Sequence, residues 1–261
     1  MSLAPDADDA TLAAACLHNT AAIGEVTVGY RDSVAEMTPG VHRHRTPVPG
    51  GLWNTVGWTD LPDDGVDDAI AATLAWYGGS CRWWTGAGTR PEDLGARLTA
   101  AGFVGDEIPA MVCDLSSDWD APDPEGLVVE RCDDPAAIDD AMVIFEAVGG
   151  PGDWLAAWAD VFAWHLHRAG RPIQMFVGRL GGQPVACGWL ARGAGVAGVY
   201  GVQTLPEHRG KGYGAALTRA PMRAGRDAGD RVAVLQAAPL AEPLYERIGF
   251  RTVAEVGLYE R

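Results

Sequence analysis

The chain has 261 residues, of which 48% are hydrophobic, and it carries a formal net charge of −15. This length suits two small domains, each with its own apolar core. The negative charge excludes the basic surface that a duplex-binding protein needs, so we expect no nucleic-acid partner. The sequence contains neither an apolar run long enough for a membrane span nor a typical secretory signal, so we expect no membrane partner and a cytoplasmic location.

The cysteine and histidine patterns do not indicate a metal site. The five cysteines are odd in number and widely spaced, which is atypical of a disulfide framework or a zinc knuckle. We therefore expect reduced, mostly buried thiols and no metal. His42 and His44 flank Arg43 without further ligands nearby, and we interpret this stretch as an exposed loop.

The first half of the chain is less regular than the second. Apolar residues three and four positions apart predict a helix over 66–77, which a Gly-Gly pair ends. A short strand over 81–85 follows, and then a second helix that ends at Gly102-Phe103 and continues as a strand to Leu115. The segment 119–126 is rich in Asp and Pro, which predicts an exposed linker.

The second half alternates between strands and helices. Strands are predicted over 127–132, 173–180, 184–191, 196–205, 232–236 and 250–259. Helices are predicted after Asp134-Pro135, over 154–165, after a glycine-rich loop near residue 210, and over 242–248.

The stretch 202–217 runs from an apolar strand through three alternating glycines into a predicted helix. Glycines let the backbone approach a ligand closely, and the N–H groups of such a loop and of the first helical turn suit a pyrophosphate. A P-loop is excluded, because Lys211 is followed by glycine. Gly210, Gly212 and Ala215 match a dinucleotide fingerprint literally, but too little of a doubly wound sheet follows them.

A third pattern, R-x-x-G-x-G/A, is matched by Arg209, Gly212 and Gly214. At this point the sequence resembles the GNAT acyltransferase superfamily. The resemblance includes the late segment 244–250, L-Y-E-R-I-G-F, and covers residues 126–261. It implies an α/β fold with a mixed, mainly antiparallel sheet flanked by helices, and acetyl-CoA as the cosubstrate.

The resemblance also implies roles for individual residues. Backbone groups of the strand before the loop would pair with the pantetheine arm, at Val202, Gln203 and Thr204. The loop would hold the pyrophosphate, at Arg209, Gly210, Lys211, Gly212, Tyr213 and Gly214. Tyr245 matches the tyrosine that often protonates the departing CoA thiolate, a role that suits a phenol placed at the sulfur.

One departure from the family pattern concerns the general base, which is often a glutamate on the strand before the loop. The stretch 196–201 contains no carboxylate. The leading hypothesis is an N-acetyltransferase that acts on a primary amine of an unidentified small molecule or peptide. The sequence indicates neither the acceptor nor the oligomeric state. The alternative is a non-catalytic protein that binds or senses acetyl-CoA, and a dinucleotide-binding oxidoreductase is a weaker one.

The first half contains a weak internal repeat of the second. The segment 94–103 ends a helix with Gly-Phe and continues as a strand, as does 244–250. Leu98 stands where Tyr245 stands, and the first half has no R-x-x-G-x-G. We therefore expect two tandem GNAT-like units: a degenerate one over 1–118, a linker over 119–126, and a competent acetyltransferase domain over 127–261.

Overall fold

The computed structural model describes residues 2–261, which divide into two compact units. Unit 1 comprises the N-terminal residues to Asp6, Val112–Leu235 and Pro243–Arg251. Unit 2 comprises Ala7–Met111, Gln236–Glu242 and Thr252–Arg261. These units differ from the expected boundaries at 118 and 126, because the end of the chain supplies a strand to unit 2 and the expected linker packs within unit 1.

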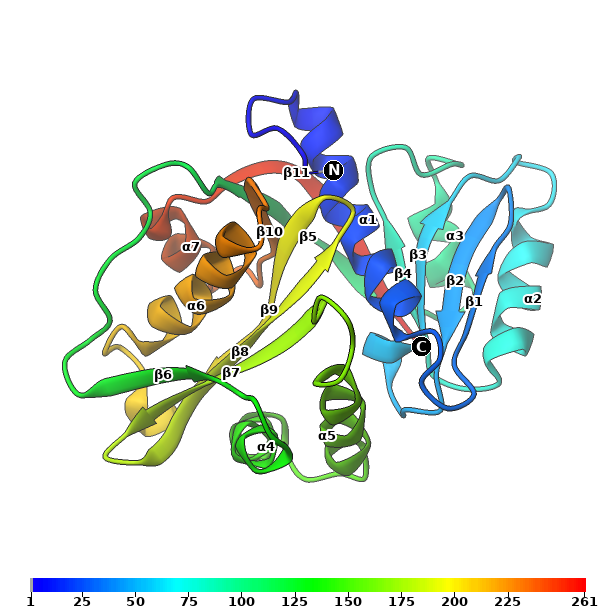
Figure 1. Ribbon diagram of the computed structural model, residues 1–261. Coiled ribbons are helices and arrows are strands. Elements are labelled where there is room, and N and C mark those ends of the chain that lie inside the picture. Colours follow the sequence, from blue (N-terminus) through cyan, green and yellow to red (C-terminus); the bar gives the residue numbers. More distant parts are fainter. Residues whose placement is uncertain (1) are drawn as a thin grey trace. The chain divides into compact units, whose positions relative to one another are not determined.

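Unit 2 combines three helices with a group of strands that form a mixed sheet (Figure 1). Its helices are α1 (Asp9–Thr27), α2 (Val66–Tyr77) and α3 (Leu94–Ala100), with a 3-10 turn η1 (Gly51–Trp53). Its strands are β1 (Val34–Met37), β2 (Val41–Arg45), β3 (Thr55–Thr59), β4 (Arg82–Thr85), most of β5 (Val104–Asp114) and β11 (Arg251–Glu260). The strand order is β1-β2-β3-β4-β11-β5, in which β3 and β4 are parallel and β11 is antiparallel to β4.

The core of unit 2 lies under α2 and α3. Trp83 and Val56, from neighbouring strands, pack there with Ile70 of α2 and Leu98 of α3, and none of the four is more than 2% exposed. Ile70 and Leu98 are among the apolar positions that predicted the two helices. Such a contiguous core is what a unit needs for its own stability.

Elements before Val66 were not predicted, and α1 shows why. Its buried side carries Asn19 and Thr20 together with apolar residues, which obscures the helical pattern. The interpretation of His42 and His44 as an exposed loop was wrong, since both lie on β2 and His44 is buried. A Cβ added at Gly24 of α1 would lie 1.8 Å from His44 Cγ, so the missing side chain makes room for the imidazole.

Unit 1 contains the regular second half of the chain (Figure 1). Its helices are α4 (Pro135–Gly149), α5 (Trp154–His165), α6 (Tyr213–Asp227) and α7 (Glu242–Ile248), with a 3-10 turn η2 (Pro206–His208). Its strands are β6 (Leu127–Arg131), β7 (Ile173–Leu180), β8 (Gln183–Gly193), β9 (Val196–Thr204) and β10 (Val232–Gln236). Neighbours in the order β10-β9-β8-β7-β6 pair antiparallel, except for the parallel pair β9–β10.

Helices cover both faces of the unit 1 sheet. On one face, a Cβ added at Gly188 of β8 would lie 2.9 Å from the carbonyl of Leu217 in α6. On the other, the next residue, Trp189, has its ring 5.5 Å from that of Phe162 in α5. Because successive side chains of a strand point to opposite faces, α6 covers one side and α5, packed with α4, the other (Figure 1).

The expected fold class is confirmed: a mixed, mainly antiparallel sheet is flanked by helices in both units. The order strand, helix, strand, helix, strand occurs twice, as β3-α2-β4-α3-β5 and as β9-α6-β10-α7-β11. None of the helices within residues 2–261 combines the length and apolarity needed to cross a bilayer.

Candidate functional site

Strands β9 and β10 pair only near their beginnings. The register of this parallel pair consists of Ala197 with Ala233 and Gly198 with Val234. Along the rest of β9, the described residues show strand pairing with β8 alone. The edge of β9 from Val199 to Thr204 therefore offers backbone N–H and C=O groups that an extended ligand can use.

Gly201 bends β9 at this edge. The β8–β9 register shifts between Cys187 and Trp189, which marks a β-bulge opposite Gly201. Gly201 has a φ of +56°, and a Cβ added there would lie 2.5 Å from Trp189 Nε1. Glycine is thus needed for both conformation and space, and the bend directs the following residues, 202–204, toward the loop.

The expected pyrophosphate loop leads from β9 into α6. Gly210 and Gly212 adopt the left-handed region, with φ of +74° and +83°. Gly212 is the N-cap of α6, and within the described chain no side chain caps this end and no acidic residue occupies its first turn. The first amides of a helix lack intrahelical acceptors, so those of Tyr213 and Gly214 suit an anion at the positive end of the helix dipole. Because the Tyr213 side chain is buried, this residue offers its backbone alone.

Two exposed cations of the loop stabilise its backbone. Arg209 Nε donates a hydrogen bond to the Thr204 carbonyl at 3.1 Å, and Lys211 Nζ donates to the Glu207 carbonyl at 3.1 Å. Both side chains are exposed to solvent. They add positive charge beside the uncapped end of α6, in a chain whose overall charge is strongly negative.

Helix α7 lies against the start of α6. A Cβ added at Gly214 would lie 3.5 Å from Leu244 Cδ2 and 3.7 Å from Thr204 Oγ1, so the end of β9, the start of α6 and α7 meet at one place. Tyr245 is half-buried, with its ring centroid 5.9 Å from that of Phe250. Burial raises the pKa of Tyr245, so its phenol is protonated at neutral pH, as a proton donor must be.

Gln203 contributes a polar group that faces no protein donor. It lies opposite Cys187 in the β8–β9 pair, and its Oε1 is buried without a hydrogen-bond partner among residues 2–261. A buried acceptor left unpaired costs free energy, so a ligand N–H fits here. Together, this acceptor, the β9 edge and the uncapped start of α6 offer hydrogen-bonding groups to an extended ligand that ends in an anion.

The environment of the cysteines disfavours thiolates. All five are buried and free, as expected. Burial raises the pKa of Cys16, Cys113 and Cys132 to about 12, so these groups are thiols rather than thiolates at neutral pH. In the described chain, no three His, Cys, Asp or Glu side chains gather closely enough to hold a metal ion.

Two residues next to this site were not indicated by any sequence pattern. A Cβ added at Gly212 would lie 3.3 Å from Pro124 Cγ, and one at Gly249 would lie 3.7 Å from Trp119 Cβ. Both Pro124 and Trp119 come from the segment expected to be an exposed linker, yet Trp119 is buried. Composition predicted a break in periodicity here, but it carries no signal for a contact with a distant loop.

A known family model matches the part of the chain that contains the glycine loop and α7. Residues 171–252 match the family model of the acetyltransferase (GNAT) domain, which spans both the glycine loop and α7. No curated protein sequence matches the chain.

Solved structures resemble nearly the whole chain. A GCN5-related N-acetyltransferase from Kribbella flavida is 18% identical, with 92% of this chain and 95% of that chain covered and a TM-score of 0.68. A tandem GNAT protein from the clavulanic acid biosynthesis pathway is 13% identical, with 93% and 87% covered and a TM-score of 0.60. A GCN5-related N-acetyltransferase from Sphaerobacter thermophilus is 17% identical, with 95% and 89% covered and a TM-score of 0.60. At these identities the likeness shows a shared fold that includes both units.

Proposed function

We propose that the protein is an N-acetyltransferase that transfers the acetyl group of acetyl-CoA to a primary amine of a small molecule or peptide, because residues 171–252 match the family model of the GNAT acetyltransferase domain. The observation that carries this proposal is the meeting of the uncapped, glycine-led start of α6 with the end of β9 and with α7. An anion site, a free strand edge and a protonated phenol on a neighbouring helix are the parts that such a reaction uses.

The cosubstrate would lie along β9 and end at α6. Backbone groups of Val202, Gln203 and Thr204 would pair with the pantetheine arm, and Gln203 Oε1 is a further acceptor for one of its amides. The pyrophosphate would be held by the loop at Arg209, Gly210, Lys211, Gly212, Tyr213 and Gly214, mainly through backbone N–H groups. This binding needs few cations, which suits an acidic chain.

The chemistry is a direct attack in a ternary complex. The neutral amine nitrogen attacks the thioester carbonyl carbon, a C–N bond forms, and the C–S bond breaks. The departing thiolate takes a proton from Tyr245, whose raised pKa leaves the phenol protonated before the reaction. β9 has no carboxylate to accept the proton of the amine, so we assign that proton to water.

A non-catalytic acetyl-CoA sensor is the second candidate, and the absence of a carboxylate on β9 is the observation that favours it. The dinucleotide-binding oxidoreductase is not supported, because that class needs a doubly wound parallel sheet, whereas β6 to β9 are antiparallel.

A thermal-shift titration with acetyl-CoA tests the proposal, with NAD and ATP as controls. A ligand at a hundred times its dissociation constant adds roughly 2.7 kcal/mol of stability, so a raised melting temperature with acetyl-CoA alone is the expected result. No shift, or a shift with NAD, would contradict the cosubstrate. Amine-dependent release of free CoA then separates an enzyme from a sensor, which binds acetyl-CoA without turnover.

A further inference from the structure

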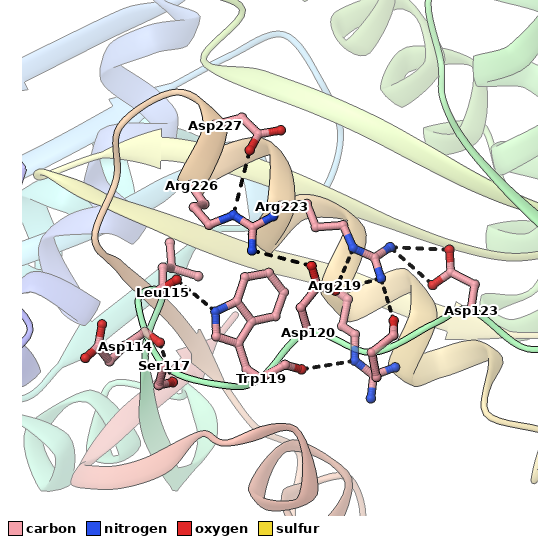
Figure 2. A network of polar contacts seen from close by, with 11 residues as sticks. Asp114, Leu115, Ser117, Trp119, Asp120, Asp123, Arg219, Arg223, Arg226 and Asp227 are labelled. Carbon is pink, nitrogen blue, oxygen red and sulfur yellow. Dashed lines mark hydrogen bonds and ion pairs between the residues drawn. The ribbon is translucent and has the colours of Figure 1, made fainter.

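Residues 115–126, which we call the strap, are fastened along α6 by three arginines (Figure 2). Arg219, Arg223 and Arg226 are four and three positions apart, which places them on one face of the helix. All three donate hydrogen bonds to the strap. Surface ion pairs are individually weak, but several that share partners form a network.

Arg223 is the centre of this network (Figure 2). Its guanidinium donates to Asp120 Oδ1 at 2.8 Å, to Asp123 Oδ1 at 3.2 Å and to the Ala121 carbonyl at 2.7 Å. Its side chain is 27% exposed, so solvent screens these contacts only in part. One planar group with five donors thus fixes both the backbone and the side chains of the strap, which a lysine could not reproduce.

Trp119 fixes the N-terminal half of the strap. Arg219 Nε donates to its carbonyl at 3.3 Å, and Arg226 lies 4.9 Å from the centre of its ring. The indole Nε1 donates to the Leu115 carbonyl at 3.0 Å, and only 3% of the residue is exposed. The indole is therefore a fixed, buried support rather than a surface group.

The strap contacts the proposed site at two points. Pro124 lies beside Gly212, the N-cap of α6, and Trp119 lies beside Gly249, which ends α7. Gly249 N–H donates to the carbonyl of Tyr245 at 3.2 Å, so Trp119 packs on the turn that follows the proposed acid. One segment thus abuts both the loop that would hold pyrophosphate and the helix that carries the phenol.

We propose that the strap is a positioning element of the acetyl-CoA site and that Arg223 is the residue that holds it in place. This inference rests on the proposed function. Glycines give the 209–214 loop conformational freedom that must be lost when its amides converge on a phosphate. A strap packed against Gly212 removes part of that freedom before binding, so less affinity is spent on ordering the loop.

The test compares Arg223→Ala with Arg179→Ala as a matched control. Arg179 also holds two carboxylates in unit 1, with Asp140 at 2.6 Å and Glu130 at 3.3 Å, and its side chain is 17% exposed. We expect Arg223→Ala to raise the acetyl-CoA dissociation constant roughly tenfold by calorimetry, and Arg179→Ala to leave it within about twofold. Equal affinities for the wild type and Arg223→Ala, or equal losses in both variants, would overturn the proposal.

Hydrogen exchange of the free protein gives a readout that does not depend on acetyl-CoA. In Arg223→Ala, amides 209–214 and 244–249 should exchange faster while those of β7 and β8 keep their rates. Uniformly faster exchange would indicate general destabilisation and contradict a positioning role. If Arg223→Ala does not fold, Asp120→Asn removes the charge that Arg223 and Arg226 share while keeping the shape. A wild type that does not bind acetyl-CoA contradicts the proposed function. In that case, hydrogen exchange of the free protein still tests whether the strap orders the loop.

Discussion

The two units end their short helices with the same turn but present different side chains from it. After α3, Phe103 N–H donates to the Leu98 carbonyl at 3.0 Å, and after α7, Phe250 N–H donates to the Tyr245 carbonyl at 3.0 Å. The intervening glycines both have positive φ, +89° and +114°, as a Schellman motif requires. Leu98 is fully buried in the core of unit 2, whereas Tyr245 is half-buried. The same backbone turn therefore presents an apolar core residue in unit 2 and a phenol in unit 1.

The helices that connect the two strands of each parallel pair show a second difference. Both α2 and α6 have a glycine N-cap without a capping side chain, Gly65 and Gly212, among the described residues. The first turn of α2 contains Asp67 and Asp68, whereas that of α6 has no acidic residue. Carboxylates at the positive end of a helix dipole occupy the place of an anion and repel phosphate. We therefore propose that unit 2 does not bind acetyl-CoA and that loop chemistry, rather than the shared fold, decides which unit does.

The largest expected effect concerns Tyr245, whose counterpart in unit 2 is Leu98. Tyr245→Phe removes the proton donor without changing the packing on Phe250, so turnover should fall roughly 10² to 10³-fold while acetyl-CoA affinity is kept. Release of CoA with an active amine measures the rate, and calorimetry the affinity.

Tyr259→Phe, in unit 2, is the control for that substitution. Burial and the nearby Glu107 and Asp106 also raise the pKa of Tyr259, so both variants lose a phenol with a raised pKa. We expect wild-type turnover from Tyr259→Phe. Equal rates for Tyr245→Phe and the wild type would remove Tyr245 from the mechanism.

Acid should destabilise both units through buried imidazoles. Burial lowers the pKa of His44, in unit 2, to about 4, and that of His165, in unit 1, to about 3. Each is neutral when folded at pH values where the unfolded chain, with a histidine pKa near 6.5, binds a proton. The stabilisation is therefore complete above about pH 6.5 and is lost as the pH falls toward the folded value, which for His44 amounts to about 3 kcal/mol.

Urea unfolding at pH 7 and at pH 4.5 checks this expectation. His44→Gln should flatten the loss of stability between the two pH values by roughly 2 to 3 kcal/mol. His167→Gln, at an exposed position, should keep the wild-type difference. An unchanged pH dependence in His44→Gln would show that His44 is not the group responsible.

The smallest expected effect separates the two helix N-caps. Gly212→Ala places a Cβ in the left-handed region, 3.3 Å from Pro124 Cγ, and should weaken acetyl-CoA binding about tenfold. Gly65→Ala is the matched control in unit 2, because a Cβ there would meet nothing within 4 Å. Thermal-shift titration ranks the two, and equal affinities would contradict both the loop assignment and the proposed difference between units.

Local sequence patterns determined much of unit 1 and one turn of unit 2. The spacing of apolar residues predicted α4, α5 and the strands from β6 to β10, and Gly-Phe after a short helix predicted the turns at 102–103 and 249–250. These features depend on neighbours a few residues apart, through helix periodicity, capping and glycine conformations, so a local pattern is enough to predict them. The R-x-x-G-x-G pattern and the later tyrosine likewise predict the candidate site from short stretches of sequence.

Only the tertiary structure decided which distant segments meet. β11 pairs with β4 rather than remaining in unit 1, His44 fits against Gly24, and the strap packs on Gly212 and Gly249. Each depends on shape and charge complementarity between segments remote in the sequence, such as Arg223 with Asp120. Composition alone made the strap resemble a solvated linker, because the arginines that bind its carboxylates lie about a hundred residues later, on a helix whose direction the fold sets.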